Sequence, residues 1–155
     1  MGAAFFYHLT RAPLEETLPV LLQKARGAGW AIAIRGRDPQ RMAWLDDRLW
    51  LGPEDSFLAH GLEGGAHDAL QPILLTTGPD AANRPQCVMA VDGAGVTPEE
   101  VQALERVCIL FDGTDPEAVQ HARGQWKALT DAGCAAQYWS EESGRWEKKA
   151  EKEAG

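Results

Sequence analysis

The sequence has 155 residues, of which 45% are hydrophobic and 25% are charged, and its formal net charge is −8. This length and this mix are typical of one soluble globular domain, and they exclude a disordered chain, a collagen-like repeat and a disulfide-dense scaffold. Because 23 acidic side chains outnumber 15 basic ones, the surface as a whole repels phosphate backbones, so we expect nucleic acid to be contacted mainly indirectly.

Short β-rich segments alternate with helical segments along the chain. Three helices are predicted to begin where a capping residue precedes a first-turn proline, at Asp38-Pro39, Thr97-Pro98 and Asp115-Pro116. In chain order, the predicted elements are a strand at 3–9, a helix from 13 that glycines 27 and 29 end, a strand at 30–35, a helix at 38–49, a long loop at 52–71, strands at 73–76 and 86–91, a helix from 97, a strand at 106–111, a helix from 115 that Gly133 closes, and a strand at 135–139.

This alternation predicts an α/β domain around a mainly parallel sheet, with helices on both faces. No internal repeat or linker divides the chain, so we expect a single domain over residues 1–140. Residues 141–155 are charged and poor in apolar side chains. They are predicted to form a C-terminal tail that is frayed and partly disordered.

Nothing in the sequence predicts a membrane span or an export signal. The longest apolar runs, around 73–75 and 108–111, fall far short of the roughly 20 residues that a membrane helix needs. No basic segment followed by an apolar one opens the chain. The cysteines Cys87, Cys108 and Cys134 form an odd, widely spaced set, which is typical of a reducing compartment. We therefore expect a cytoplasmic protein with no membrane partner.

Motifs for phosphate binding are weak or absent. Open α/β sheets usually bind ligands at the carboxyl ends of their strands, and Gly93-Ala94-Gly95 follows a predicted strand. However, Pro98 stands where a dinucleotide fingerprint needs its third glycine, and no G-x-x-x-x-G-K-[ST] motif occurs. A flexible turn is the better interpretation of Gly93-Ala94-Gly95.

The histidines and cysteines show no C-x-x-C or H-x-x-x-H spacing. His60 and His67 share the long loop with Asp55 and Asp68, so a metal site there is one alternative, and an ordinary loop is the favoured one. Ser56 and His60 are an alternative pair of nucleophile and base. No nucleophile-elbow sequence surrounds Ser56, which is instead expected to cap a turn. The sequence therefore predicts no catalytic residue, no metal and no cofactor.

The last helix carries a cation and aromatic arrangement of a different kind. At 100° per residue, its predicted inward stripe consists of Val119, Ala122, Trp126 and Leu129.

Arg123 and Lys127 lie one turn apart beside Trp126, and Thr130 lies between them and the stripe. Two cations next to a large aromatic residue suit a short partner segment that carries a carboxylate and an apolar anchor. The alternative is a solvated helix face on which the cations pair with Glu117 or Asp131.

Several segments, in order and at consistent separations, carry a family resemblance. They are 3–9 (AAFFYHL), 43–51 (AWLDDRLWL) leading into 56–61, Asn83-Arg84-Pro85, 122–127 (ARGQWK), 132–133, 138–139 and 144–149. From about Ala3 to Lys149 the sequence resembles the chi subunit family of bacterial DNA polymerase III holoenzyme. The resemblance implies a three-layer, Rossmann-like fold and a non-catalytic accessory subunit of a DNA-directed DNA polymerase complex, acting in DNA replication.

The resemblance also implies partners. Members of the family link the clamp-loader complex to single-stranded DNA-binding protein by gripping the acidic C-terminal tail of that protein, which ends in phenylalanine. The matching pocket positions here are Arg123, Trp126 and Lys127, with tryptophan in the place of a more usual tyrosine. Val119 and Thr130 lie where some relatives carry extra basic residues. The psi subunit is a second implied partner, and an accessory helicase is a third.

A rival hypothesis from another functional class remains open. A small nucleotide- or metabolite-binding enzyme would use the strand ends near Gly93–Gly95 and the His60–His67 loop, as such proteins do at the carboxyl edge of a Rossmann-like sheet.

Overall fold

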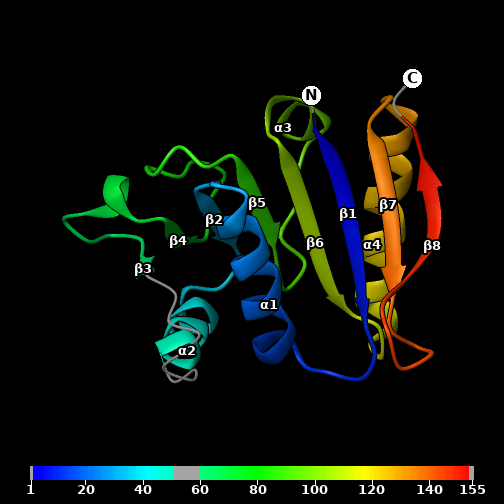
Figure 1. The fold of residues 1–155 in the computed structure, drawn as a ribbon, viewed down its shortest axis with the longest axis horizontal. Coiled ribbons are helices and arrows are strands. Elements are labelled where there is room, and N and C mark those ends of the chain that lie inside the picture. The colour runs from blue at the N-terminus through cyan, green and yellow to red at the C-terminus, as the bar shows by residue number, and fades with distance from the viewer. Residues whose placement is uncertain (1, 51–59, 154–155) are drawn as a thin grey trace.

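The computed structural model describes residues 2–50 and 60–153. Among these residues, eight strands form one sheet in the order β3-β4-β2-β5-β6-β1-β7-β8 (Figure 1). Neighbouring strands run parallel except β7 and β8. The strands are β1 (Ala3–Leu9), β2 (Ile32–Arg35), β3 (Gly61–Leu62), β4 (Ile73–Thr76), β5 (Cys87–Ala90), β6 (Arg106–Asp112), β7 (Ala135–Ser140) and β8 (Glu147–Lys152).

Helices cover both faces of this sheet. They are α1 (Leu14–Gly27), α2 (Pro39–Trp50), α3 (Pro98–Ala103) and α4 (Pro116–Asp131), with a short 3₁₀ turn at Asp68–Leu70. Side chains of α1 and α2 pack into one apolar cluster, and side chains of α3 and α4 into a second one on the opposite face. Figure 1 shows α1 and α2 in front of the sheet and α4 behind it. The predicted three-layer α/β class is confirmed.

Local capping explains where two of the helices begin. The Thr97 hydroxyl accepts the amide N–H of Glu100 at 3.2 Å, while the Glu100 carboxylate accepts the amide N–H of Thr97 at 3.0 Å. This reciprocal capping box starts α3. Asp115 caps α4 by accepting the amide N–H of Glu117 at 3.0 Å. Both predicted starts are confirmed.

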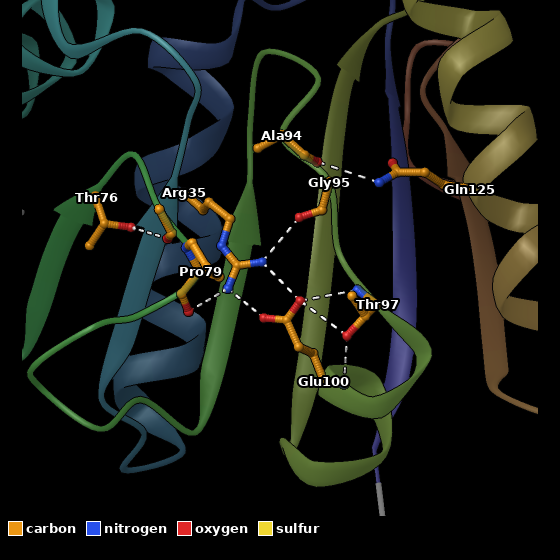
Figure 2. Close-up of polar contacts among 9 residues, drawn as sticks. Arg35, Thr76, Pro79, Ala94, Gly95, Thr97, Glu100 and Gln125 are labelled. Atoms are coloured by element: carbon orange, nitrogen blue, oxygen red, sulfur yellow. Dashed lines mark hydrogen bonds and ion pairs between the residues drawn. The ribbon is translucent and has the colours of Figure 1, made fainter.

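Buried Arg35 ties the carboxyl end of β2 to the start of α3 (Figure 2). Its guanidinium forms an ion pair with Glu100 and donates to the carbonyl oxygens of Gly95, at 3.0 Å, and Pro79, at 3.1 Å. The carboxylate of Glu100 thus both pairs with Arg35 and takes part in the capping box. The loop between β5 and α3, which holds the sequence 93–95, is fixed as a turn in which Ala94 N–H donates to the carbonyl of Val91 at 3.1 Å. The turn interpretation is confirmed.

The C-terminal segment differs from the sequence expectation. Residues 147–152, predicted to fray, form β8, which pairs antiparallel with β7. The strand buries no stripe of apolar side chains, so its sequence gives no period-2 pattern. It forms because it satisfies the backbone groups that β7 would otherwise expose at the sheet edge, and its lysines and glutamates suit an outermost strand. The predicted loop at 52–71 also contains β3 and the 3₁₀ turn, while 51–59 lies outside the described residues.

The sheet order creates a switch point between β1 and β6. These strands are parallel neighbours, yet β1 leads into α1 on one face and β6 leads into α4 on the other. In open α/β sheets such a point leaves a crevice at the carboxyl ends of the strands. The fold therefore has two candidate binding regions: this crevice and the outer surface of α4.

Candidate functional site: the outer surface of α4

The packing of α4 follows the predicted stripe. Ala122 and Leu129 are buried against the sheet, at 2% and 1% exposure, and Val119 and Trp126 are half-buried against the same apolar cluster. Arg123 and Lys127 are exposed. The predicted inward stripe is confirmed, and it leaves one edge of Trp126 at the surface beside the two cations.

Trp126 is held in place by aromatic neighbours from two strands. Its ring centroid lies 5.4 Å from that of Phe6 on β1 and 6.1 Å from that of Tyr138 on β7, both in edge-on geometry. Tyr138 is fixed in turn by a 3.0 Å hydrogen bond between its hydroxyl and Nδ1 of His8. A rigid indole is a better apolar wall than a mobile one, because less conformational entropy is lost on binding.

The two cations of α4 differ in their partners. Lys127 Nζ lies 2.8 Å from Asp131 Oδ2, and this acidic neighbour raises the pKa of Lys127. Both side chains are more than 60% exposed, so water screens the pair and it contributes little stability. Arg123 has no hydrogen bond or ion pair to any residue within 2–50 or 60–153. The pairing expected under the solvated-face alternative is thus present between Lys127 and Asp131, and Arg123 pairs with neither Glu117 nor Asp131.

The charge of Arg123 also affects the pKa of Tyr138. Burial raises the pKa of the Tyr138 phenol, and the nearby charge of Arg123 opposes that rise. Tyr138 therefore borders the site from β7, a strand that helical periodicity alone does not bring there. Its position follows from the register in which Phe6 of β1 faces Tyr138 of β7.

Thr130 and Val119 complete the predicted site without adding charge. The Thr130 hydroxyl donates to the carbonyl of Trp126 at 2.8 Å, so its proton is already used in a hydrogen bond to the preceding turn of the helix. Half-buried Val119 lies one turn before Arg123. We call the five residues Val119, Arg123, Trp126, Lys127 and Thr130 the α4 patch.

A cleft of about 740 Å³ lies at the carboxyl ends of β1, β5 and β6. Its lining includes Gly93, His121 and Gln125, so the strand ends named by the rival hypothesis do border a cavity. The hydroxyl oxygen of Thr10 and the side-chain oxygen of Gln125 are buried and have no hydrogen-bond partner within the described residues.

The loop between β1 and α1 is already occupied by a carboxylate of this chain. Glu141 Oε1 accepts the backbone N–H groups of Thr10, Arg11 and Ala12 at 3.0, 2.9 and 3.1 Å. Burial acts to raise the pKa of Glu141, but these three amide hydrogen bonds and the charge of Arg11 outweigh it and leave the pKa lowered. Consecutive backbone amides in such a loop commonly bind phosphate in nucleotide-binding folds. Here a phosphate would have to displace a buried carboxylate.

The histidine loop does not join this cleft. His60 is buried with its Nε2 3.2 Å from Asp46 Oδ1 of α2, and His67 is exposed. Asp55 and Ser56 lie outside the described residues. Across 2–50 and 60–153, no group of three or more histidine, cysteine or acidic side chains has a metal-binding arrangement.

The three cysteines are free thiols in the core. Among the helices of the described residues, none has both the length and the apolarity needed to cross a bilayer.

Comparison with known proteins identifies the family. The chain matches the model of the family described as "DNA polymerase III chi subunit, HolC" over residues 1–137, a span that contains the whole of α4. A search of curated proteins found no match. Together with the confirmed α/β architecture, this match shows that the chain belongs to the DNA polymerase III chi subunit family and is an accessory subunit of that replicative polymerase.

Proposed function

We propose that this chain is a non-catalytic adaptor that links the clamp-loader complex to single-stranded DNA-binding protein during DNA replication. Its α4 patch would bind the acidic C-terminal tail of that protein. The observation that carries the proposal is Arg123, an exposed cation with no partner within the described residues, next to the half-buried indole of Trp126.

The proposed contact combines charge and apolar burial. The guanidinium of Arg123 binds the terminal carboxylate of the tail, Lys127 supports it, and the terminal phenyl ring packs beside Trp126. Charge-assisted hydrogen bonds contribute about 1.5–3 kcal/mol each, and burying the ring adds roughly 1.5–3 kcal/mol. After the entropic cost of association is subtracted, we expect a dissociation constant of micromolar order. Because the contact is electrostatic and lies at the surface, salt weakens it.

Fluorescence anisotropy tests the contact. A labelled acidic peptide ending in Asp-Ile-Pro-Phe is titrated with the full chain at low and high salt. We expect saturable, salt-sensitive binding that is lost without the terminal phenylalanine. The double variant Arg123→Ala/Lys127→Ala should abolish binding with its circular dichroism spectrum unchanged.

A matched control removes two positive charges elsewhere. Arg26 and Arg48 are exposed residues of α1 and α2, which pack on the opposite face of the sheet. The variant Arg26→Ala/Arg48→Ala should bind the peptide within about twofold of wild type, because screening confines charge effects to about 8 Å at physiological salt. Equal affinity of the α4 double variant and wild type would refute the site.

An adaptor also needs a second contact. The psi subunit, or another clamp-loader component, is the proposed partner, and an accessory helicase is a further candidate. Tagged chain should retain polymerase III components from cell extract, and the Arg123→Ala/Lys127→Ala variant should still retain them. Loss of both partners in that variant would argue against two separate contacts.

The cleft supports a second candidate function, binding of a small metabolite at the strand ends. The unpartnered oxygens of Thr10 and Gln125 favour it, and the occupied β1–α1 loop counts against a phosphate group there. A ligand that binds the folded state raises the melting temperature. A nucleotide panel that produces no thermal shift would leave the adaptor as the supported function.

A further inference from the structure

A second cavity lies on the opposite face of the sheet from the α4 patch. Its volume is about 260 Å³, and it opens between the C-terminal half of α1 and strands β1, β5 and β6. Buried Cys87, Met89 and Cys108 form its floor, and half-buried Tyr7 and Trp30 line it. Cavities for drug-sized ligands are usually about 300–1,000 Å³, so this one suits a single ring or a comparable apolar group.

Arg106, at the start of β6, borders the cavity with its guanidinium held over aromatic rings. The guanidinium carbon lies 4.1 Å from the ring centroid of Phe5 and 5.1 Å from that of Trp30. The residue is half-buried, and its side chain has no hydrogen bond or ion pair to any residue that the structure describes. A guanidinium carries five N–H donors. With no acceptor for them among the described residues, these donors are available to an anionic ligand.

The charge around this cavity has one sign. Lys24 of α1 is the other charged residue in the lining, which contains no acidic side chain among the described residues. The thiol of Cys108 and the phenol of Tyr7 stay neutral near pH 7. A hydrogen bond with Cys87 and burial raise the pKa of Cys108, and burial is the main cause of the raised pKa of Tyr7. An anion entering the cavity would therefore meet cations and neutral groups.

We propose that this cavity binds a carboxylate that carries one apolar or aromatic group, with the ring between Tyr7 and Trp30 and the carboxylate on Arg106 and Lys24. Such chemistry has two sources: a free aromatic acid, and the C-terminal residue of a peptide. The site is separate from the α4 patch, because Arg106 and its rings pack with the cluster under α1 while Trp126 packs with the cluster under α4.

Two-dimensional ¹H–¹⁵N NMR on the full chain tests the proposal. N-acetylphenylalanine is titrated into the protein, and N-acetylphenylalanine amide, which lacks the carboxylate, serves as the matched ligand control. We expect saturable shifts at the Trp30 indole N–H and at the amides of β6 with the acid only. Arg106→Met keeps an apolar stem over Phe5 and should weaken binding about tenfold, the equivalent of one lost charge-assisted hydrogen bond.

Two further variants separate this site from the proposed adaptor site and from a folding defect. Arg123→Ala/Lys127→Ala should bind N-acetylphenylalanine as wild type does. Arg106→Lys keeps the charge without the planar fork and should recover part of the affinity that Arg106→Met loses. Shifts mapped to α4 instead of Trp30, or equal shifts with acid and amide, would overturn the proposal.

The source of the ligand is resolved in the Arg123→Ala/Lys127→Ala background, where the proposed adaptor site is disabled. Binding of a short peptide with a free C-terminal phenylalanine, and not of its amidated form, assigns the cavity to peptide termini. Binding of the free acid without the peptide assigns it to a small aromatic acid. No saturable shift with either ligand at about ten millimolar, roughly ten-thousandfold above a micromolar dissociation constant, would refute the site.

Discussion

The neighbouring residue Asp131 limits how available the ammonium group of Lys127 is for the proposed tail. This ammonium group is shared with Asp131 at 2.8 Å, so a carboxylate that approaches the α4 patch competes with an intramolecular one. This competition is weak, because an exposed ion pair contributes little free energy. Asp131 thus acts as a built-in competitor for the proposed tail.

Replacing this competitor should strengthen tail binding. We expect Asp131→Asn to lower the dissociation constant for the acidic peptide about two- to threefold at low salt, by freeing Lys127 and removing a repelling charge. Anisotropy titration measures the effect. Asp47→Asn, the same charge change at an exposed position of α2, is the control. Equal gains in both variants would mean that net charge, and not the pair, sets the affinity.

Glu141 is a residue whose backbone hydrogen bonds make stability depend on pH. It is 7% exposed and accepts three backbone N–H groups. Its folded pKa lies below the ordinary value. The stability it contributes is therefore fully present above the ordinary glutamate pKa of about 4.3, and it is lost as the pH falls through the lower folded pKa.

We expect Glu141→Gln to lower the free energy of unfolding at pH 7 by about 1–3 kcal/mol, because a neutral amide oxygen is a weaker acceptor for three donors. The difference from wild type should shrink as the pH is taken below 4. Urea unfolding followed by tryptophan fluorescence at several pH values measures both effects. A difference that stays constant down to pH 3 would show that the charge of Glu141 is not responsible.

At the scale of elements, α3 is a helix of six residues whose stability depends on its first turn. Isolated helices this short do not form in water. The capping box and the ion pair between Glu100 and buried Arg35 stabilise α3 where its intrinsic helix propensity is insufficient. Hydrogen bonds from Arg35 and from Thr97 outweigh the burial of Glu100 and lower its pKa.

Glu100→Ala should therefore cost about 3–5 kcal/mol, because it leaves Arg35 buried without its counterion and opens the cap. Glu99→Ala, one residue earlier and exposed, should change stability by less than about 0.5 kcal/mol. Chemical denaturation of the two variants side by side makes the comparison. Similar losses in both would indicate a general sensitivity of α3 to alanine.

At the scale of the whole molecule, the sheet separates the two proposed binding sites. The α4 patch belongs to the apolar cluster under α3 and α4, and the cavity beside Arg106 belongs to the cluster under α1 and α2. In a chain of net charge −8, each of them carries two basic side chains. Because the two sites share no contacting residue, the effects of variants at the two sites on the free energy of unfolding should be additive.

The sequence by itself determined the features that local chemistry controls. The capping residues and first-turn prolines at Thr97 and Asp115 predicted the starts of α3 and α4. Helical periodicity alone predicted which side of α4 is buried and that Arg123 and Lys127 lie together outside. Such signals are spread over a few neighbouring residues, so no knowledge of distant contacts is needed.

Only the tertiary structure decided features that join distant parts of the chain. The hydrogen bond from Thr10 N–H to Glu141 spans 131 positions, and Tyr138 reaches Trp126 through the β1–β7 register. The position of Arg106 over Phe5 and Trp30 likewise joins residues that are far apart in the chain. The charged segment 147–152 becomes a strand because β7 offers an open edge. Backbone pairing and the burial of charge depend on partners that a local pattern does not specify, so these features were decided by the fold.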